Sequence, residues 1–149
     1  MSLRLPYWTF APEAVKRMMA LNSYLVGSEI EASLRHLIWL RVSQINGCAY
    51  CVDLHTIEAL QDGETLQRLF CLVAWEETPL FSDRERSALA WAETLTNVST
   101  THAPDEVYES VRSQFDDKQL VDLTLMIAAM NAWNRMAIGF RRQPSQRGP

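Results

Sequence analysis

The sequence predicts an all-α protein, and three observations support this prediction. Apolar residues recur at helical spacing over most of the 149 residues. Proline, capping and glycine residues fall where helices begin and end. No stretch of any length alternates apolar and polar residues as a half-buried strand does. We therefore expect one domain of about six to seven helices, in a chain long enough to bury a sizeable core.

The ends of the first three helices can be predicted from the sequence. Pro12 at a first helical position predicts a helix over 12–27. A second helix is expected over 31–46, because Asn46-Gly47 is a helix stop. A third helix then begins close to Cys48 and ends at Asp62-Gly63. The loop between the second and third helices therefore carries the first cysteine.

The remaining helices are expected at 64–77, 82–97 and 104–115, and from 117 to beyond 137. The clearest start among these is Ser82-Asp83-Arg84-Glu85, which has the spacing of a capping box. Three arginines lie near the C-terminus, at positions 141, 142 and 147. We expect them to form a tail or to complement the dipole of the last helix.

Composition excludes several classes of partner. The net charge is −4 and the 14 basic residues form no stripe, so nucleic acid is not expected as a partner. No run approaches the roughly 20 apolar residues that span a membrane, and no signal peptide is visible at the start. A cytoplasmic location is therefore expected. In a reducing compartment, a CxxC pair is more often catalytic or metal-binding than structural.

The segment 47–55 carries the chemistry. Cys48, Cys51 and His55 are three, four and seven residues apart, so they share one face of a helix. A helix N-terminus and a nearby imidazole both favour the thiolate, which is the nucleophilic form of cysteine. A second thiol within reach resolves the oxidised product of the first. This pattern indicates dithiol redox chemistry.

Two other interpretations of the cysteines stay open. The pair can be structural or accidental. It can also be half of a zinc site, although such a site needs four ligands and only Cys71, His36 and His102 remain as soft donors. Cys71 lies in an apolar run and is predicted to be a buried core thiol.

Four segments together form a recognisable pattern: RVSQINGCAYCVDLH at 41–55, AW at 74–75, FSDRERSALAWAE at 81–93 and NAWNR at 131–135. This pattern resembles the AhpD-like alkylhydroperoxidases of the carboxymuconolactone decarboxylase superfamily. The resemblance covers about residues 30 to 140 and includes the CxxC motif together with its flanking sequence. We accordingly expect an N-terminal helical segment at 1–29, an AhpD-like core at 30–142 and a polar tail at 143–149, all within one domain.

The resemblance implies a fold, an activity and partners. The expected fold is a helical bundle that assembles into homo-oligomers, either trimers or hexamers. The expected activity is reduction of alkyl hydroperoxides through the cysteine pair. The sequence itself contains no haem, flavin or nucleotide signature, so no cofactor is expected, and no metal is assigned to the site. A dithiol or a thiol protein would return the electrons.

The resemblance also assigns roles to individual residues. Cys48 and Cys51 match the redox pair, and His55 matches the histidine of the proton relay. His36 stands where the founding members carry the relay glutamate, twelve residues before the first cysteine, and is a candidate relay member. Glu58 shares the helical face of the pair and can substitute, although a solvated surface position is the favoured interpretation.

Two alternatives to a peroxidase remain. The first is a general disulfide reductase or redox relay with little peroxidase activity. The second is a non-enzymatic helical module whose thiols sense redox state or bind metal. A lactone decarboxylase is disfavoured, because that chemistry does not need the thiol pair.

Overall fold

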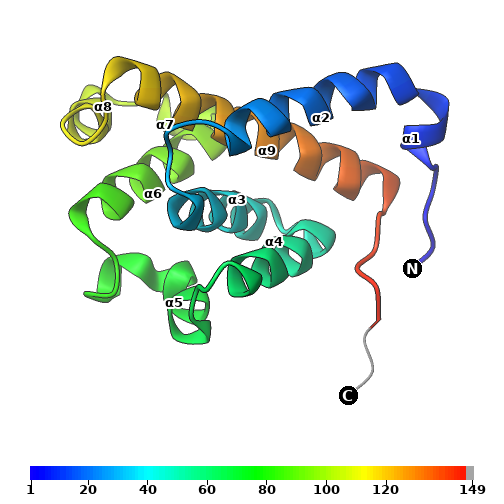
Figure 1. Ribbon diagram of the computed structural model, residues 1–149, viewed down its shortest axis with the longest axis horizontal. Helices are drawn as coiled ribbons and strands as arrows, with labels where there is room; N and C mark the ends of the chain where they lie inside the picture. The colour runs from blue at the N-terminus through cyan, green and yellow to red at the C-terminus, as the bar shows by residue number, and fades with distance from the viewer. Residues whose placement is uncertain (147–149) are drawn as a thin grey trace.

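The computed structural model describes residues 1–146, and all of its regular secondary structure over that range is helical, which confirms the predicted fold class. Figure 1 shows the helices gathered into one bundle, with α2 lying along α9 on one side. The elements are α1 (Tyr7–Phe10), α2 (Pro12–Val26), α3 (Ala32–Asn46), α4 (Ala49–Gln61), α5 (Leu66–Cys71), the 3₁₀-helix η1 (Leu72–Glu77), α6 (Asp83–Thr96), α7 (Val98–Thr101), α8 (Asp105–Arg112) and α9 (Asp117–Phe140).

The number of helices is higher than predicted for local reasons. The single helix expected over 64–77 is divided into α5 and η1, and Ala74 within η1 has non-helical backbone angles of φ −126° and ψ 39°. The helices α1 and α7 are one turn each, which is too short to show apolar periodicity. The other helices lie where they were predicted, within a few residues at each end. The last three residues of the predicted polar tail, 147–149, lie outside the described residues.

Helix ends follow the capping signals in the sequence. The predicted capping box is present at α6, where the Ser82 side chain accepts from the Glu85 N–H and the Glu85 side chain accepts from the Ser82 N–H. Gly47 ends α3 with φ 68°, a left-handed conformation that glycine adopts without a steric penalty. The chain therefore turns sharply between α3 and α4.

The centre of the bundle is α3. It packs against α4, α6 and α9, and Figure 1 shows it between these helices. Its side chains are buried around most of the helix, including the fully buried Leu37, Ile38 and Val42. An α-helix with so little exposed surface holds its neighbours in fixed positions, so the start of α4 is anchored by the core.

Cys71 was predicted to be buried in the core, and this prediction is wrong. It is a free thiol of intermediate exposure at the end of α5. Leu69 and Leu72 take the inward positions of this short segment, whereas Phe70 and Val73 are exposed. The apolar run reflects a helix with apolar residues on both faces, and periodicity cannot assign such a run to the core.

A network around Arg68 joins α5 to the start of α6. Its guanidinium donates to Glu64 at 3.0 Å and to Glu85, and also bonds the carbonyl of Leu80. The same group lies 4.9 Å from the centre of the Phe81 ring. Both carboxylates are largely buried, so each depends on this one cation for charge compensation.

Substitution of Arg68 by methionine is expected to lower the free energy of unfolding by about 2–3 kcal/mol, because two poorly exposed carboxylates lose their partner. Urea unfolding at pH 7 measures this value. The matched control is Arg112→Met, which removes a solvent-exposed pair with Asp117 and should have little effect. Equal destabilisation by both variants would contradict the structural role of Arg68.

Candidate active site

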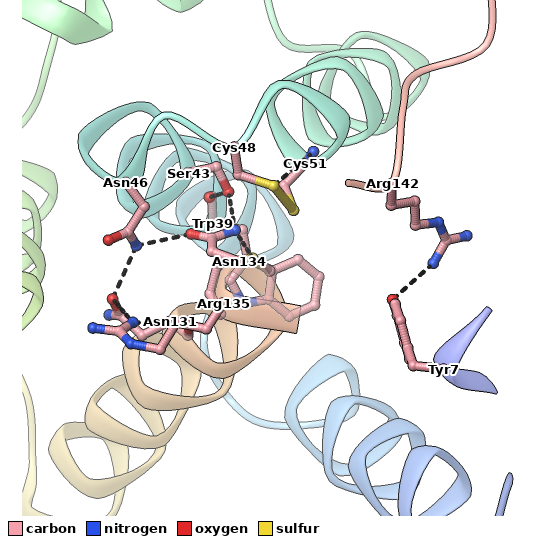
Figure 2. Close-up of a disulfide and its surroundings, with 11 residues drawn as sticks. Tyr7, Trp39, Ser43, Asn46, Cys48, Cys51, Asn131, Asn134, Arg135 and Arg142 are labelled. Atoms are coloured by element: carbon pink, nitrogen blue, oxygen red, sulfur yellow. Dashed lines mark hydrogen bonds between the residues drawn. A yellow bond between two sulfur atoms is a disulfide. The ribbon is translucent and has the colours of Figure 1, made fainter. Parts of the chain in front are cut away.

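The two cysteines of the motif occupy the start of α4. Cys48 is the N-cap residue and its Sγ accepts a hydrogen bond from the N–H of Cys51 at 3.3 Å. The two residues form a disulfide, with their Cα atoms 5.3 Å apart (Figure 2). Both are buried, Cys48 being 1% and Cys51 4% exposed. The predicted proximity of the two thiols at a helix N-terminus is therefore confirmed.

His55 lies one turn further along α4 and is also buried, at 6% exposure. Its Nδ1 is 2.8 Å from Oε2 of Glu58. Since a carboxylate only accepts, this contact places a proton on Nδ1 and leaves a lone pair on Nε2 of the neutral ring. The geometry defines which nitrogen of His55 is available as a base.

Glu58 was expected to be a solvated surface residue, and this interpretation is wrong. Its carboxylate is partly exposed but is held by His55. The hydrogen bond from His55 lowers the pKa of Glu58 below its ordinary value of 4.5 and outweighs burial, which acts in the opposite direction. The i,i+3 spacing of the two residues was the signal in the sequence. Glu58 is thus ionised at neutral pH and faces an imidazole.

His36 makes a separate histidine–carboxylate pair. Its Nε2 is 2.7 Å from Oδ2 of Asp62, at the end of α4, and its Nδ1 has no hydrogen-bond partner in the structure. The ring is buried in α3 at 4% exposure. The structure therefore pairs His36 with Asp62, and pairs His55 with Glu58.

A cluster of asparagines anchors the loop that carries Cys48. The Nδ2 of Asn46 donates to Oδ1 of both Asn131 and Asn134 at 2.9 Å each. Asn134 is fully buried and donates in turn to Ser43 at 3.1 Å. Figure 2 shows these side chains joining the end of α3 to α9 beside the disulfide. Satisfied polar networks of this kind fix the position of a loop within an apolar core.

An apolar pocket of about 440 Å³ opens beside the disulfide. Cys51 and His55 both line it, whereas Cys48 is not among its lining residues. Most of the remaining surface is apolar and comes from α2, α4 and α9, namely Val15, Met19, Leu54, Met130, Trp133 and Ala137. An apolar site with a few polar groups is typical of pockets that bind small organic molecules.

The lining of this pocket includes residues that sequence reasoning missed. Tyr7 and Trp8 come from α1, and Arg142 comes from the segment after α9. The guanidinium of Arg142 lies 3.9 Å from the centre of the Tyr50 ring and 5.2 Å from that of Trp8. The sequence suggested only that this arginine forms part of a tail or complements a helix dipole, and it gave no indication of these aromatic contacts. The N- and C-terminal segments meet only in the folded chain, so no local pattern could have indicated them.

Two observations concern other kinds of site. Within residues 1–146, no three His, Cys, Asp or Glu side chains gather in a way that could hold a metal ion. None of the helices described in the structure is both long and apolar enough to cross a membrane.

The fold and the site together define a helical thiol–disulfide protein, in which a buried CxxC pair and a histidine adjoin an apolar pocket. Residues 12–94 match the model of the carboxymuconolactone decarboxylase family, and the chain belongs to this family, in its AhpD-like branch. It is 46% identical to the uncharacterized protein YdfG of Bacillus subtilis over 138 residues, which are 93% of this chain and 94% of YdfG.

Solved structures agree with this assignment. A protein of unknown function from Agrobacterium tumefaciens, ATU0492, proposed to be the antioxidant defence protein AhpD, is 41% identical with a TM-score of 0.95. The similarity covers 98% of this chain and all of that one. An uncharacterized peroxidase-related protein from Silicibacter sp. TM1040 is 26% identical with a TM-score of 0.82, over 93% of this chain and 74% of that one.

Proposed function

We propose that this protein is a thiol-dependent peroxidase that reduces organic hydroperoxides through Cys48 and Cys51. One observation carries the proposal: Cys51 and His55 line the same apolar pocket, and Cys51 is disulfide-bonded to a second cysteine. A substrate in this pocket meets a sulfur atom and a base together. The chain belongs to the AhpD-like branch, and its structural relatives include a proposed antioxidant defence protein and a peroxidase-related protein. These relationships support the same activity.

The first step uses the reduced protein. His55 takes the proton of the Cys51 thiol, and the thiolate attacks the terminal oxygen of the hydroperoxide. The O–O bond breaks, an alcohol leaves with the proton held by His55, and Cys51 becomes a sulfenic acid. Cys51 is assigned this role because it faces the pocket.

The second step closes the disulfide. The Cys48 sulfur attacks the sulfenic sulfur of Cys51, an S–S bond forms and the hydroxyl leaves as water with the thiol proton. Cys48 is at the N-cap of α4, where the helix dipole favours its thiolate. An external dithiol then reduces the disulfide and is itself oxidised. His36 has no step in this scheme, and its role in the relay stays a prediction.

Burial of the disulfide favours this reaction over general disulfide reduction. Both cysteines are at most 4% exposed, so another protein's disulfide cannot approach their sulfur atoms without a structural change. A hydroperoxide or a small dithiol can enter through the pocket beside Cys51. Reduction of protein disulfides therefore remains the second candidate function.

The proposal is tested by counting thiols in the reduced protein before and after one equivalent of an organic hydroperoxide. We expect the loss of two thiols per chain and their recovery with dithiothreitol. Cys48→Ser should lose only one thiol, that of Cys51 as its sulfenic acid, because a disulfide cannot form. If all thiols survive the peroxide and still react with a disulfide reagent, the peroxidase proposal is wrong and the disulfide reductase is favoured.

We also propose that the chain forms a homo-oligomer, as its resemblance to the alkylhydroperoxidases implies. Large apolar side chains on the surface support association, among them Phe10, Phe70 and Val73, which are 69%, 72% and 62% exposed. Light scattering of the purified protein measures the number of chains.

A further inference from the structure

The pocket beside Cys51 is lined by a positively charged side chain and by no negatively charged one. Its lining residues include one permanent cation, Arg142, and no aspartate or glutamate. Among residues 1–146, no ion pair involves Arg142. In all but one of the ion pairs that these residues do form, the basic side chain is less than 50% exposed. The one cation of this pocket is therefore not neutralised by the described part of the chain.

The position of Arg142 is fixed by the fold. Arg141 ends α9 in the left-handed conformation, with φ 57°, and the N–H of Arg142 donates to the carbonyl of Ala137 at 2.9 Å. This turn ends α9 and sets the direction in which the chain leaves the helix (Figure 1). The N–H of Arg4 also bonds the carbonyl of Phe140 at 2.9 Å, which ties the N-terminal segment to the same place.

The guanidinium itself is held by aromatic rings. It lies over Tyr50 and Trp8, and Nη1 donates to the hydroxyl of Tyr7 at 3.3 Å. Figure 2 shows Arg142 and Tyr7 on the opposite side of the disulfide from Asn46 and Asn131. Cation–π contacts orient a guanidinium without satisfying its N–H groups. Only one of its roughly five N–H groups has a hydrogen-bond partner in the described chain.

A guanidinium with unused donors in the lining of an apolar pocket is suited to bind a carboxylate, often through two parallel hydrogen bonds. The pocket volume of about 440 Å³ accommodates an apolar body of several carbon atoms or one aromatic ring. In that pose the apolar walls contain the body of the ligand, and the reactive sulfur of Cys51 lies at the same pocket.

We infer that the pocket is specific for organic hydroperoxides that carry a carboxylate, and that Arg142 binds this carboxylate. This inference rests on the proposed peroxidase activity and names its substrate class. Arg142 determines specificity and takes no part in bond breaking. A neutral or very small hydroperoxide leaves the guanidinium without an anion and gains nothing from it.

The first test compares cumene hydroperoxide with its para-carboxylate derivative, which has nearly the same size. Dithiothreitol is the reductant, because it is uncharged and any effect of charge then comes from the hydroperoxide. We expect kcat/KM to be about tenfold higher for the carboxylate, mainly through KM, as one charge-assisted hydrogen-bonded pair predicts.

Three variants assign the preference to Arg142. In Arg142→Gln the ratio of the two kcat/KM values should fall to about one, and Arg142→Lys should keep part of it. The matched control is Arg141→Gln, which removes the neighbouring charge outside the pocket and should keep the tenfold ratio. Equal loss of the ratio in Arg141→Gln and Arg142→Gln would show a general field effect and overturn the inference.

A second test does not depend on turnover. The alcohols that correspond to the two hydroperoxides are titrated against the protein, and the fluorescence of Trp8 and Trp133 in the pocket reports binding. We expect the carboxylate alcohol to bind about tenfold more tightly to the wild type and equally to Arg142→Gln. Equal binding of both alcohols to the wild type overturns the inference even if peroxidase activity is found. Tighter binding of the carboxylate without peroxide turnover retains the carboxylate site and rejects the peroxidase.

Discussion

Cys51→Ser is expected to reduce the rate of peroxide reduction by roughly 10³-fold or more, because the variant lacks the thiol that we propose as the nucleophile. Cys51 and His55 line the pocket, and no other cysteine is among its lining residues, so no other thiol is placed to replace Cys51. Stopped-flow measurement of peroxide consumption by the reduced protein gives the rate of this first step. The variant should also stay at its original mass when treated with hydroperoxide.

Cys48→Ser is expected to behave differently in the same experiment. Its Cys51 should still react once with peroxide and gain one oxygen atom as a sulfenic acid, which mass spectrometry detects. Catalytic turnover should stop, because no partner thiol resolves the product. The control is Cys71→Ser, which removes the third thiol on α5 and should retain full turnover. A first step that survives in Cys51→Ser and is lost in Cys48→Ser would reverse the roles assigned here.

Glu58→Gln is expected to slow thiol oxidation by about tenfold or more. A neutral amide can still accept a hydrogen bond from Nδ1 of His55, but it does not stabilise the imidazolium that forms when His55 takes the thiol proton. Glu58→Asp keeps the charge and should recover part of the rate. Stopped-flow measurement of thiol loss in the reduced protein gives this rate for the wild type and both variants.

The pair of His36 and Asp62 provides the matched comparison. Asp62→Asn removes a carboxylate at nearly the same distance from an imidazole, 2.7 Å against 2.8 Å. His36 does not line the pocket, so this change should leave the rate within about twofold of the wild type, below the effect expected of a general base or its partner. A large effect of Asp62→Asn with none of Glu58→Gln would place the relay at His36, where the resemblance to the alkylhydroperoxidases aligns it.

Glu58→Gln is also expected to change the pH dependence of stability. The pKa of Glu58 is lower in the folded protein than its ordinary value of 4.5, so its ionised form stabilises the folded state. This contribution is fully present above a pH of about 4.5 and is lost as the pH falls through the lowered pKa of the folded protein. The difference in free energy of unfolding between wild type and Glu58→Gln should therefore shrink in acid.

Much of the site was predictable because its residues are neighbours along the chain. Cys48, Cys51 and His55 lie on one helical turn and the next, and helical geometry alone brings them together. Glu58 also has helical spacing from His55, three residues before it. The sequence does not distinguish a glutamate that bonds His55 from one that is only solvated. Only the direction and burial of the neighbouring imidazole distinguish them.

Local sequence determined the helical class, the capping box at Ser82, the stop at Gly47 and the position of two thiols at the start of α4. These features depend on backbone preferences and hydrogen bonds within a few residues, so they can be derived from the chain itself. Tertiary structure alone decided that the thiols are buried and that a pocket opens beside Cys51. It also placed Arg142 against Tyr7, 135 positions away, because the contacts of chain ends are set by packing of the whole bundle.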